Sequence, residues 1–188
     1  HVVLPDQFFD RTSRRDEHTF FGNGIAAHIG FSEPVSGELR GILYEAARAE
    51  GATAHNGGTY VNMDGPAFST KAESLANRQL GFDVIGMTNV AEAKLAREAE
   101  MALATMAMVT DYDCWHDDEE AVNVQTVIGH LMANAELAQK ILKRAVSAIP
   151  IDAEWIEHTA LDTAIITPKE YWPAGTVDTL GPVIERML

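Results

Sequence analysis

The spacing of apolar and polar residues predicts two strongly amphipathic helices. After Ser36, apolar side chains recur at helical spacing until Gly51 ends the pattern: Leu39, Ile42, Leu43, Ala46, Ala47. A longer stripe follows Asn123, which we expect to cap its helix, and Pro150 lies beyond its end. Its members are Val124, Val127, Ile128, Leu131, Ala135, Ala138, Leu142 and Ala145.

Between these helices, the pattern predicts alternating strands and helices. Strands are expected at the N-terminus (1–4) and at 59–63, 82–86 and 101–109. The last run carries no charge, so we expect a strand buried on both faces. Thr70 with Glu73, and Asn89 with Glu92, are capping-box signatures of two intervening helices. Further helices are expected at 154–166 and 176–188, and an ordered loop with short strands at 8–33. The alternation is typical of an α/β fold with helices on both faces of a sheet.

Composition narrows the classes of function. The chain has 188 residues, a net charge of −14 and 46% hydrophobic residues, which is typical of one folded domain. The negative charge disfavours nucleic-acid binding, and no apolar run is long enough to span a membrane. A lone cysteine, Cys114, leaves no internal disulfide and is typical of a cytoplasmic protein. The first residues show neither an initiator Met nor a signal sequence, so we expect the C-terminal part of a longer polypeptide.

Thr88 is a candidate ligand-binding residue. In α/β sheets, ligands bind beyond the carboxyl ends of strands, and Thr88 lies where the strand 82–86 leads into a helix. Free N–H groups and the helix dipole favour an anion there. The alternative is that Thr88 and Asn89 only cap the helix, which is the commoner role of such residues.

Asp111 and Asp113 follow the next strand, and both side chains point to the same side if the chain stays extended. Paired carboxylates in such a crevice suit proton transfer or a donor-rich ligand. We interpret residues 117–120 as a solvated acidic loop. The spacing of the acidic and histidine residues matches neither an EF-hand loop nor a zinc pattern, so we expect no metal.

Three segments resemble motifs of the purine nucleoside phosphorylase superfamily, in the same order and spacing. Residues 58–74 (GTYVNMDGPAFSTKAES) resemble its base-binding motif, and residues 86–96 (GMTNVAEAKLA) its ribose and phosphate motif. Residues 109–115 (VTDYDCW) are similar to the signature of its S-methyl-5′-thioadenosine phosphorylases. The resemblance extends over about residues 2–150 and fades in the tail after Trp155, which is longer than in these relatives.

The resemblance implies a phosphorylase-like fold, a mixed sheet flanked by helices, of which residues 1–188 would be the C-terminal part. The family's N-terminal phosphate loop is absent, so we expect little turnover from this chain alone. The implied reaction is phosphorolysis of S-methyl-5′-thioadenosine in purine and methionine salvage. Inorganic phosphate is the co-substrate, and no metal or organic cofactor is required. A homo-oligomer is implied, a trimer or a dimer of trimers.

The resemblance also implies roles for single residues. Phe68 and Ser69 would lie at the base, Met87 at the ribose and Thr88 at the phosphate. Asp111 would face purine N7 as the catalytic residue, and Asp113 would face the 6-amino group. The remaining roles concern the 5′ end of the nucleoside. His28 would reach a neighbouring subunit's site there, and an apolar wall around the methylthio group would be formed by Val124, Val127 and, with a poorer alignment, Ile166.

The chemistry of the base favours adenine. Carboxylates at Asp111 and Asp113 accept from an amine, whereas the 6-oxopurine phosphorylases of the family carry Asn at the first position and Glu at Ser69. Asp111 would have to be protonated to donate to N7 as the base departs. Two alternatives remain open: a phosphorylase of 6-oxopurine nucleosides or methylthioinosine, and a non-catalytic purine-binding homologue. Gly86 departs from relatives that carry Asn there.

Overall fold

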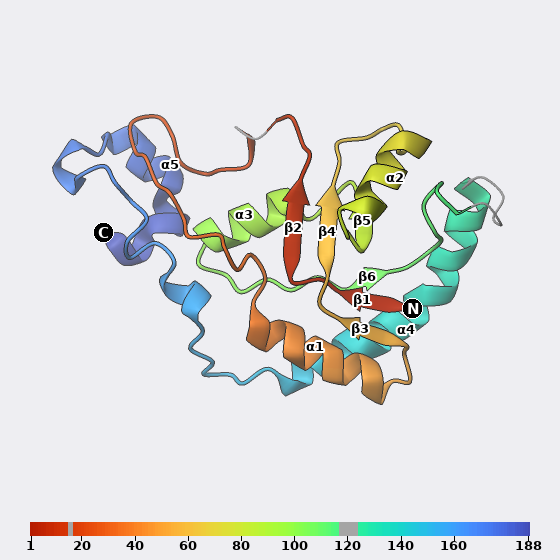
Figure 1. Ribbon diagram of the computed structural model, residues 1–188. Helices are drawn as coiled ribbons and strands as arrows, with labels where there is room; N and C mark the ends of the chain where they lie inside the picture. Colours follow the sequence, from red (N-terminus) through yellow and green to blue (C-terminus); the bar gives the residue numbers. More distant parts are fainter. Residues whose placement is uncertain (15–16, 117–123) are drawn as a thin grey trace.

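The computed structural model describes residues 1–14, 17–116 and 124–188 of the chain (Figure 1). Its strands are β1 (Val2–Leu4), β2 (Gln7–Asp10), β3 (Ala54–Asn56), β4 (Thr59–Asn62), β5 (Val84–Gly86) and β6 (Ala107–Met108). Its α-helices are α1 (Gly37–Ala49), α2 (Lys71–Gln79), α3 (Val90–Glu98), α4 (Val124–Ala148) and α5 (Ala174–Ile184). The described residues include the 3₁₀ turns η2 (Ile156–Thr159), η3 (Lys169–Tyr171) and η4 (Glu185–Met187). The α/β class predicted from the pattern is confirmed.

The strands form two three-stranded sheets, in the orders β3-β1-β6 and β2-β4-β5. Two parallel segments, residues 2–10 and 54–62, run through both sheets and bend between them. Their register is unchanged across the bend: Val2 pairs with Ala54, and Gln7 pairs with Thr59. At the bend, Gly58 has a φ of +116°, and a Cβ there would lie 2.9 Å from Asp83 Oδ2. Glycine is therefore required where the sheet changes direction.

The first sheet is mixed and packs against two helices. β1 is parallel to β3 and antiparallel to β6. Val2 and Leu4, which are fully buried, point to the same side and meet residues of α1 and α4 in one hydrophobic cluster: Leu43, Ala46, Ala47, Ile141, Ala145. α1 begins as predicted, with the Ser36 side chain accepting a hydrogen bond from the Leu39 N–H.

The second sheet is parallel, and its carboxyl ends form one row. Asp10 pairs with Asn62 across β2 and β4, and Asn62 pairs with Gly86 across β4 and β5. α2 connects β4 to β5 and begins with the predicted capping box of Thr70 and Glu73. α3 follows β5, so its N-terminus starts from this row of strand ends.

A second hydrophobic cluster lies away from both sheets. It joins the loop after β2 to the C-terminal tail through Phe21, Ile25, Leu161, Ala164, Leu180 and Ile184. Figure 1 shows the blue tail beside the red and orange loop, at the opposite end of the molecule from the N-terminus of α4. The tail is thus part of the folded chain.

Two predicted elements are wrong in extent. Only Ala107 and Met108 of the run 101–109 form a strand, and Met101 is 60% exposed. Within the described sheet, the pairing with β1 covers only these two residues. Earlier in the run, the Leu103 carbonyl accepts a hydrogen bond from the Ser36 N–H, which lies outside any strand. The helix expected at 154–166 is a 3₁₀ turn followed by tight turns. Long-range partners compete there for the backbone: the Leu161 N–H donates to Glu100, and Ile165 bridges to Ala27.

None of the helices in the described part of the chain combines the length and the apolar character that crossing a membrane demands.

A matched pair of isoleucines tests the first cluster. Ile141 is fully buried on α4, whereas Ile151 is fully exposed just after it. We expect Ile141→Ala to lower the free energy of unfolding by about 2–5 kcal/mol, because it removes buried methyl groups and leaves a cavity. Ile151→Ala should change it by less than about 0.5 kcal/mol. Urea unfolding checks both; equal effects would contradict this packing.

Candidate active site

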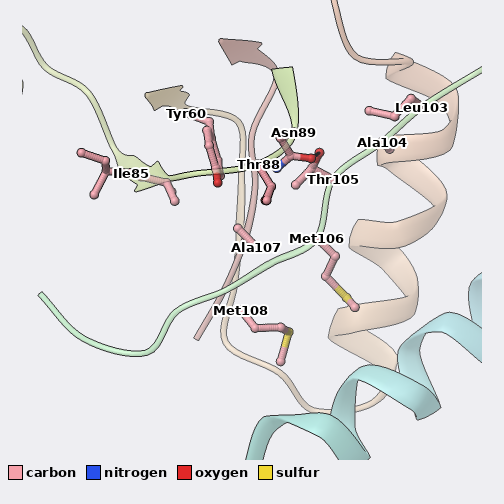
Figure 2. A pocket seen from close by; sticks show the side chains of 11 residues that line it. Tyr60, Ile85, Thr88, Asn89, Leu103, Ala104, Thr105, Met106, Ala107 and Met108 are labelled. Carbon is pink, nitrogen blue, oxygen red and sulfur yellow. Dashed lines mark hydrogen bonds between the residues drawn. The ribbon is translucent and has the colours of Figure 1, made fainter. Parts of the chain in front are cut away.

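A cavity of about 470 Å³ lies between β5 and the segment 103–108 (Figure 2). It is lined by Tyr60, Val84, Ile85, Thr88, Asn89 and residues 103–108. An edge strand of each sheet borders this cavity: β5 is an edge strand of the sheet β2-β4-β5, and β6 is an edge strand of the sheet β3-β1-β6. The cavity therefore combines polar side chains with two strand edges that pair with no further strand in the described residues.

Thr88 lies at the cavity, and the protein does not use it as a helix cap. The N-cap of α3 is Asn89, whose N–H donates to Glu92 Oε2 at 2.8 Å and whose side-chain oxygen accepts from the Thr105 hydroxyl at 2.9 Å. Asn62 Oδ1 accepts the N–H of Val90 at 2.9 Å. Thr88 itself is exposed, and its hydroxyl makes no hydrogen bond to any residue of the described ranges. Asn89 thus has the capping role that the alternative gave it, whereas Thr88 does not share that role.

The backbone beside Thr88 is close-packed. Tyr60 is buried, and its hydroxyl stands so near Gly86 that a Cβ at this position would overlap it. The Gly86 that departs from some relatives is thus explained by the tyrosine opposite. Met87 packs against the turn of the base motif, where a Cβ on Gly65 would lie 2.6 Å from its sulfur. Met87 and the loop that carries Phe68 are therefore neighbours.

The two loops that carry the candidate base-binding residues meet each other. The Cys114 thiol donates to the Ser69 carbonyl oxygen at 3.5 Å. The guanidinium of Arg78, on α2, lies 4.0 Å from the centroid of the Trp115 ring, an attractive cation–π arrangement. Phe68 is 62% exposed, so a flat aromatic face is available to a ligand.

Asp111 and Asp113 share one side of their segment. Both are half-buried, and the intervening Tyr112 is exposed, which agrees with the extended chain expected from the sequence. The Thr110 hydroxyl donates to Asp111 Oδ2 at 2.6 Å, and the Cys114 N–H donates to Asp113 Oδ1 at 2.8 Å. Each carboxyl therefore has one oxygen bonded to its own loop, while its other oxygen bonds to no described residue.

His28 and Ile166 lie together, apart from these loops. Ala27 and Ile165 form an isolated antiparallel bridge, the Ile166 N–H donates to Ala26, and the His28 N–H donates to Ala164 at 2.8 Å. Both side chains are exposed. No contact within the described ranges joins His28 to Asp111 or Thr88. Contacts thus link the base loops to each other and to Met87, which precedes Thr88, whereas none within the described ranges brings His28 or Ile166 to them.

Val124 and Val127 fall in the first turns of α4, and their side chains lie outside the described part of the structure. The acidic loop 117–120 lies outside it as well. Among the described residues, no group of three or more His, Cys, Asp or Glu side chains could hold a metal ion.

The phosphorylase superfamily model matches residues 1–147. This chain belongs to that superfamily. It is 54% identical to the S-methyl-5′-thioadenosine phosphorylase of Koribacter versatilis over 98% of this chain and 63% of the relative. It is 49% identical to that of Geobacter sulfurreducens, over 98% and 64%. The chain thus spans somewhat less than two thirds of the length of these relatives.

Solved structures agree with the family. A methylthioadenosine phosphorylase from an antarctic soil metagenomic library matches with a TM-score of 0.89 and 45% identity, over 97% of this chain and 64% of that one. The methylthioadenosine phosphorylase from Schistosoma mansoni in complex with adenine matches with a TM-score of 0.80 and 30% identity, over 90% and 66%. Because the bacterial relatives align with 98% of this chain, the expectation that the likeness fades after about residue 150 is wrong for them.

Sequence reasoning missed a charged face of α3, the helix that starts beside the superfamily's phosphate motif. Glu98 is 5% exposed and accepts from the Thr19 hydroxyl at 2.7 Å and from the Phe20 N–H at 2.6 Å. Lys94 forms an ion pair with Asp10 at 2.6 Å. Lys94 and Glu98 lie at helical spacing on one face, but their partners are the last residue of β2 and a loop that no periodicity predicts.

The pair at the end of β2 has an electrostatic signature. Burial by itself raises the pKa of Asp10, but hydrogen bonds from Lys94 and from the Thr12 hydroxyl and N–H outweigh it and lower the pKa to about 2. A carboxyl whose pKa is lowered by folding stabilises the folded state above its unfolded pKa. That contribution is lost as the pH falls from about 4 to about 2.

We therefore expect Lys94→Met to lower the free energy of unfolding by about 1–2 kcal/mol at pH 7 and by much less near pH 2. The control is Lys140→Met, because the exposed Lys140–Glu136 pair joins two residues of one helix; it should leave stability unchanged. Denaturant unfolding across this pH range measures both, and a loss for Lys94→Met that is independent of pH would count against the pairing.

Proposed function

We propose that this chain is the C-terminal part of a single domain that cleaves S-methyl-5′-thioadenosine with phosphate. The products are adenine and 5-methylthioribose 1-phosphate. The observation that carries the proposal is the placement of two half-buried carboxyls, Asp111 and Asp113, on one side of a segment bound to the Phe68–Ser69 loop. The bacterial relatives that carry this name align with nearly the whole chain.

Hydrogen-bond acceptors of the protein select the purine base in this proposal. Adenine presents a 6-amino donor, and Asp113 keeps one oxygen that is not bonded to the described protein. A 6-oxo group would face a carboxylate and leave both unsatisfied, at a cost of roughly 1–3 kcal/mol. The exposed ring of Phe68 offers a stacking face for the purine.

In this proposal, the phosphate binds at the start of α3. Thr88 contributes a free hydroxyl there, and the helix dipole attracts an anion. The proposed site of phosphate borders the cavity between β5 and segment 103–108. We infer that the remainder of the domain, which the relatives' extra third represents, seats strands against these two edges and completes the phosphate site. The low turnover expected of residues 1–188 alone follows from this arrangement.

The 5′ end is assigned to an interface between protomers. His28 is exposed and has no contact with Asp111 in the described residues, which supports a role in a neighbouring protomer's site within a trimer or a dimer of trimers. Val124 and Val127 remain the proposed apolar wall for the methylthio group. Phosphate is the only co-substrate in this proposal, with no metal or organic cofactor, and a lone cysteine supports a cytoplasmic location.

Catalysis assists departure of the base. The N9–C1′ bond breaks with its electrons moving to the purine, the ribose takes on cationic character, and a phosphate oxygen bonds to C1′. Protonated Asp111 donates to N7, which neutralises the charge that develops on the base. The hydrogen bond from the Thr110 hydroxyl holds this carboxyl in place and leaves its other oxygen for the purine.

Asp111→Asn in the full-length domain tests the proton-donor role. We expect kcat/KM for methylthioadenosine to fall by about 100-fold or more, because an amide cannot supply the proton. The ratio of inosine to methylthioadenosine turnover should rise, since the amide can donate to a 6-oxopurine. Asp152→Asn changes an exposed carboxyl beyond the C-terminal end of α4 and serves as the control. Wild-type turnover by Asp111→Asn, or a wild-type preference for inosine, would overturn the proposal.

A further inference from the structure

Arg97 binds the turn that follows His28. Its Nη1 donates to the Gly30 carbonyl oxygen at 3.0 Å, and its Nη2 donates to the Glu33 carbonyl oxygen at 2.5 Å. Its guanidinium carbon lies 6.0 Å from the centroid of the Phe31 ring. The planar guanidinium of Arg97 thus binds two carbonyl oxygens at once and lies near the Phe31 ring. A lysine cannot reproduce this geometry, because its ammonium group is not a planar fork of donors.

The other side of His28 is also held. The C-terminal tail binds it by the bridge from Ala27 to Ile165, and the Ala26 N–H donates to the Thr167 hydroxyl at 2.9 Å. The backbone around His28 is thus restrained on both sides, while its imidazole stays exposed. An exposed side chain on a restrained backbone is preorganised to bind a partner.

Arg97 belongs to the helix that begins at the proposed phosphate site. α3 has nine residues, and Thr88 lies just before its N-cap. Near its other end, Arg97 holds segment 30–33, Glu98 holds the earlier part of the same loop at Thr19, and Lys94 pairs with Asp10 at the end of β2. A short regular helix therefore joins the proposed phosphate contact to the segment that follows His28.

We propose that Arg97 is a positioning residue that sets His28 against the 5′ substituent of the nucleoside bound by the neighbouring protomer. This inference rests on the proposed function and deepens it. Arg97 touches neither substrate nor phosphate, and it acts through the backbone of segment 30–33. Loss of the fork lets this segment move, so the binding of the 5′ end weakens while the chemistry at the base remains.

The experiment is a double-mutant cycle in the full-length oligomer, with Arg97→Met, His28→Ala and the double variant. Steady-state kinetics with methylthioadenosine and phosphate, together with thermal unfolding, are measured for each. We expect Arg97→Met to raise KM for the nucleoside about tenfold, with kcat and the KM for phosphate changed by less than about threefold. Arg97→Lys should behave like Arg97→Met, because the ammonium cannot bind both carbonyls.

The coupling with His28 decides the inference. If Arg97 acts through His28, Arg97→Met adds no further loss in the His28→Ala background. Losses that multiply, or a fall in thermal stability and kcat without a change in nucleoside KM, overturn the inference. Arg48→Met is the matched control, since the ion pair and the cation–π contact of Arg48 among the described residues are with Glu45 and Tyr44 of its own helix α1. A wild-type oligomer without activity on methylthioadenosine would refute the proposed function itself, which separates the two failures.

Discussion

The structure depends on one bent pair of parallel segments, residues 2–10 and 54–62. Their constant register carries the chain from the first sheet into the second and lines up the strand ends Asp10, Asn62 and Gly86. Any slip by one residue would exchange the buried and exposed faces of both sheets. The row of strand ends also contacts the start of α3, because the side chain of Asn62 accepts a hydrogen bond from the first N–H of that helix.

α3 then links the chemistry to the rest of the chain. Its N-terminus stands at the cavity, its buried side packs through Val90 and Ala93, and its charged face binds the loop after β2. The carboxylate of Glu98 is buried but fully engaged, which is the condition under which a buried charge is tolerated. α3 is therefore bonded at its N-terminus to the end of β4 and near its C-terminus to the loop after β2, and it fixes that loop relative to the sheet.

The elements with local signals were predictable from the sequence. Ser36 and the box of Thr70 and Glu73 start their helices where expected, because caps act within one turn of the chain. Asp111 and Asp113 could be placed on one side because the extended chain alternates by two. The strand predicted at 101–109 was too long. A lack of charge indicates burial, but it does not specify which residues find a partner strand.

Long-range contacts account for what sequence reasoning could not reach. Arg97 is recognised as a clamp only once the carbonyls of Gly30 and Glu33 are placed around it. The turns after Trp155 follow from bonds to Glu100 and Ala27, which lie far away in the sequence. Tyr60 opposite Gly86 likewise joins two motifs that, in the sequence, lie on separate elements.

The central claim is that two carboxyls select a 6-aminopurine. Calorimetric titration of the full-length domain with adenine and with hypoxanthine, each in the presence of phosphate, tests it most directly. Binding of adenine at least about tenfold tighter than hypoxanthine is the predicted result, because only the amine satisfies Asp113. Equal affinities, or tighter binding of hypoxanthine, would contradict the account.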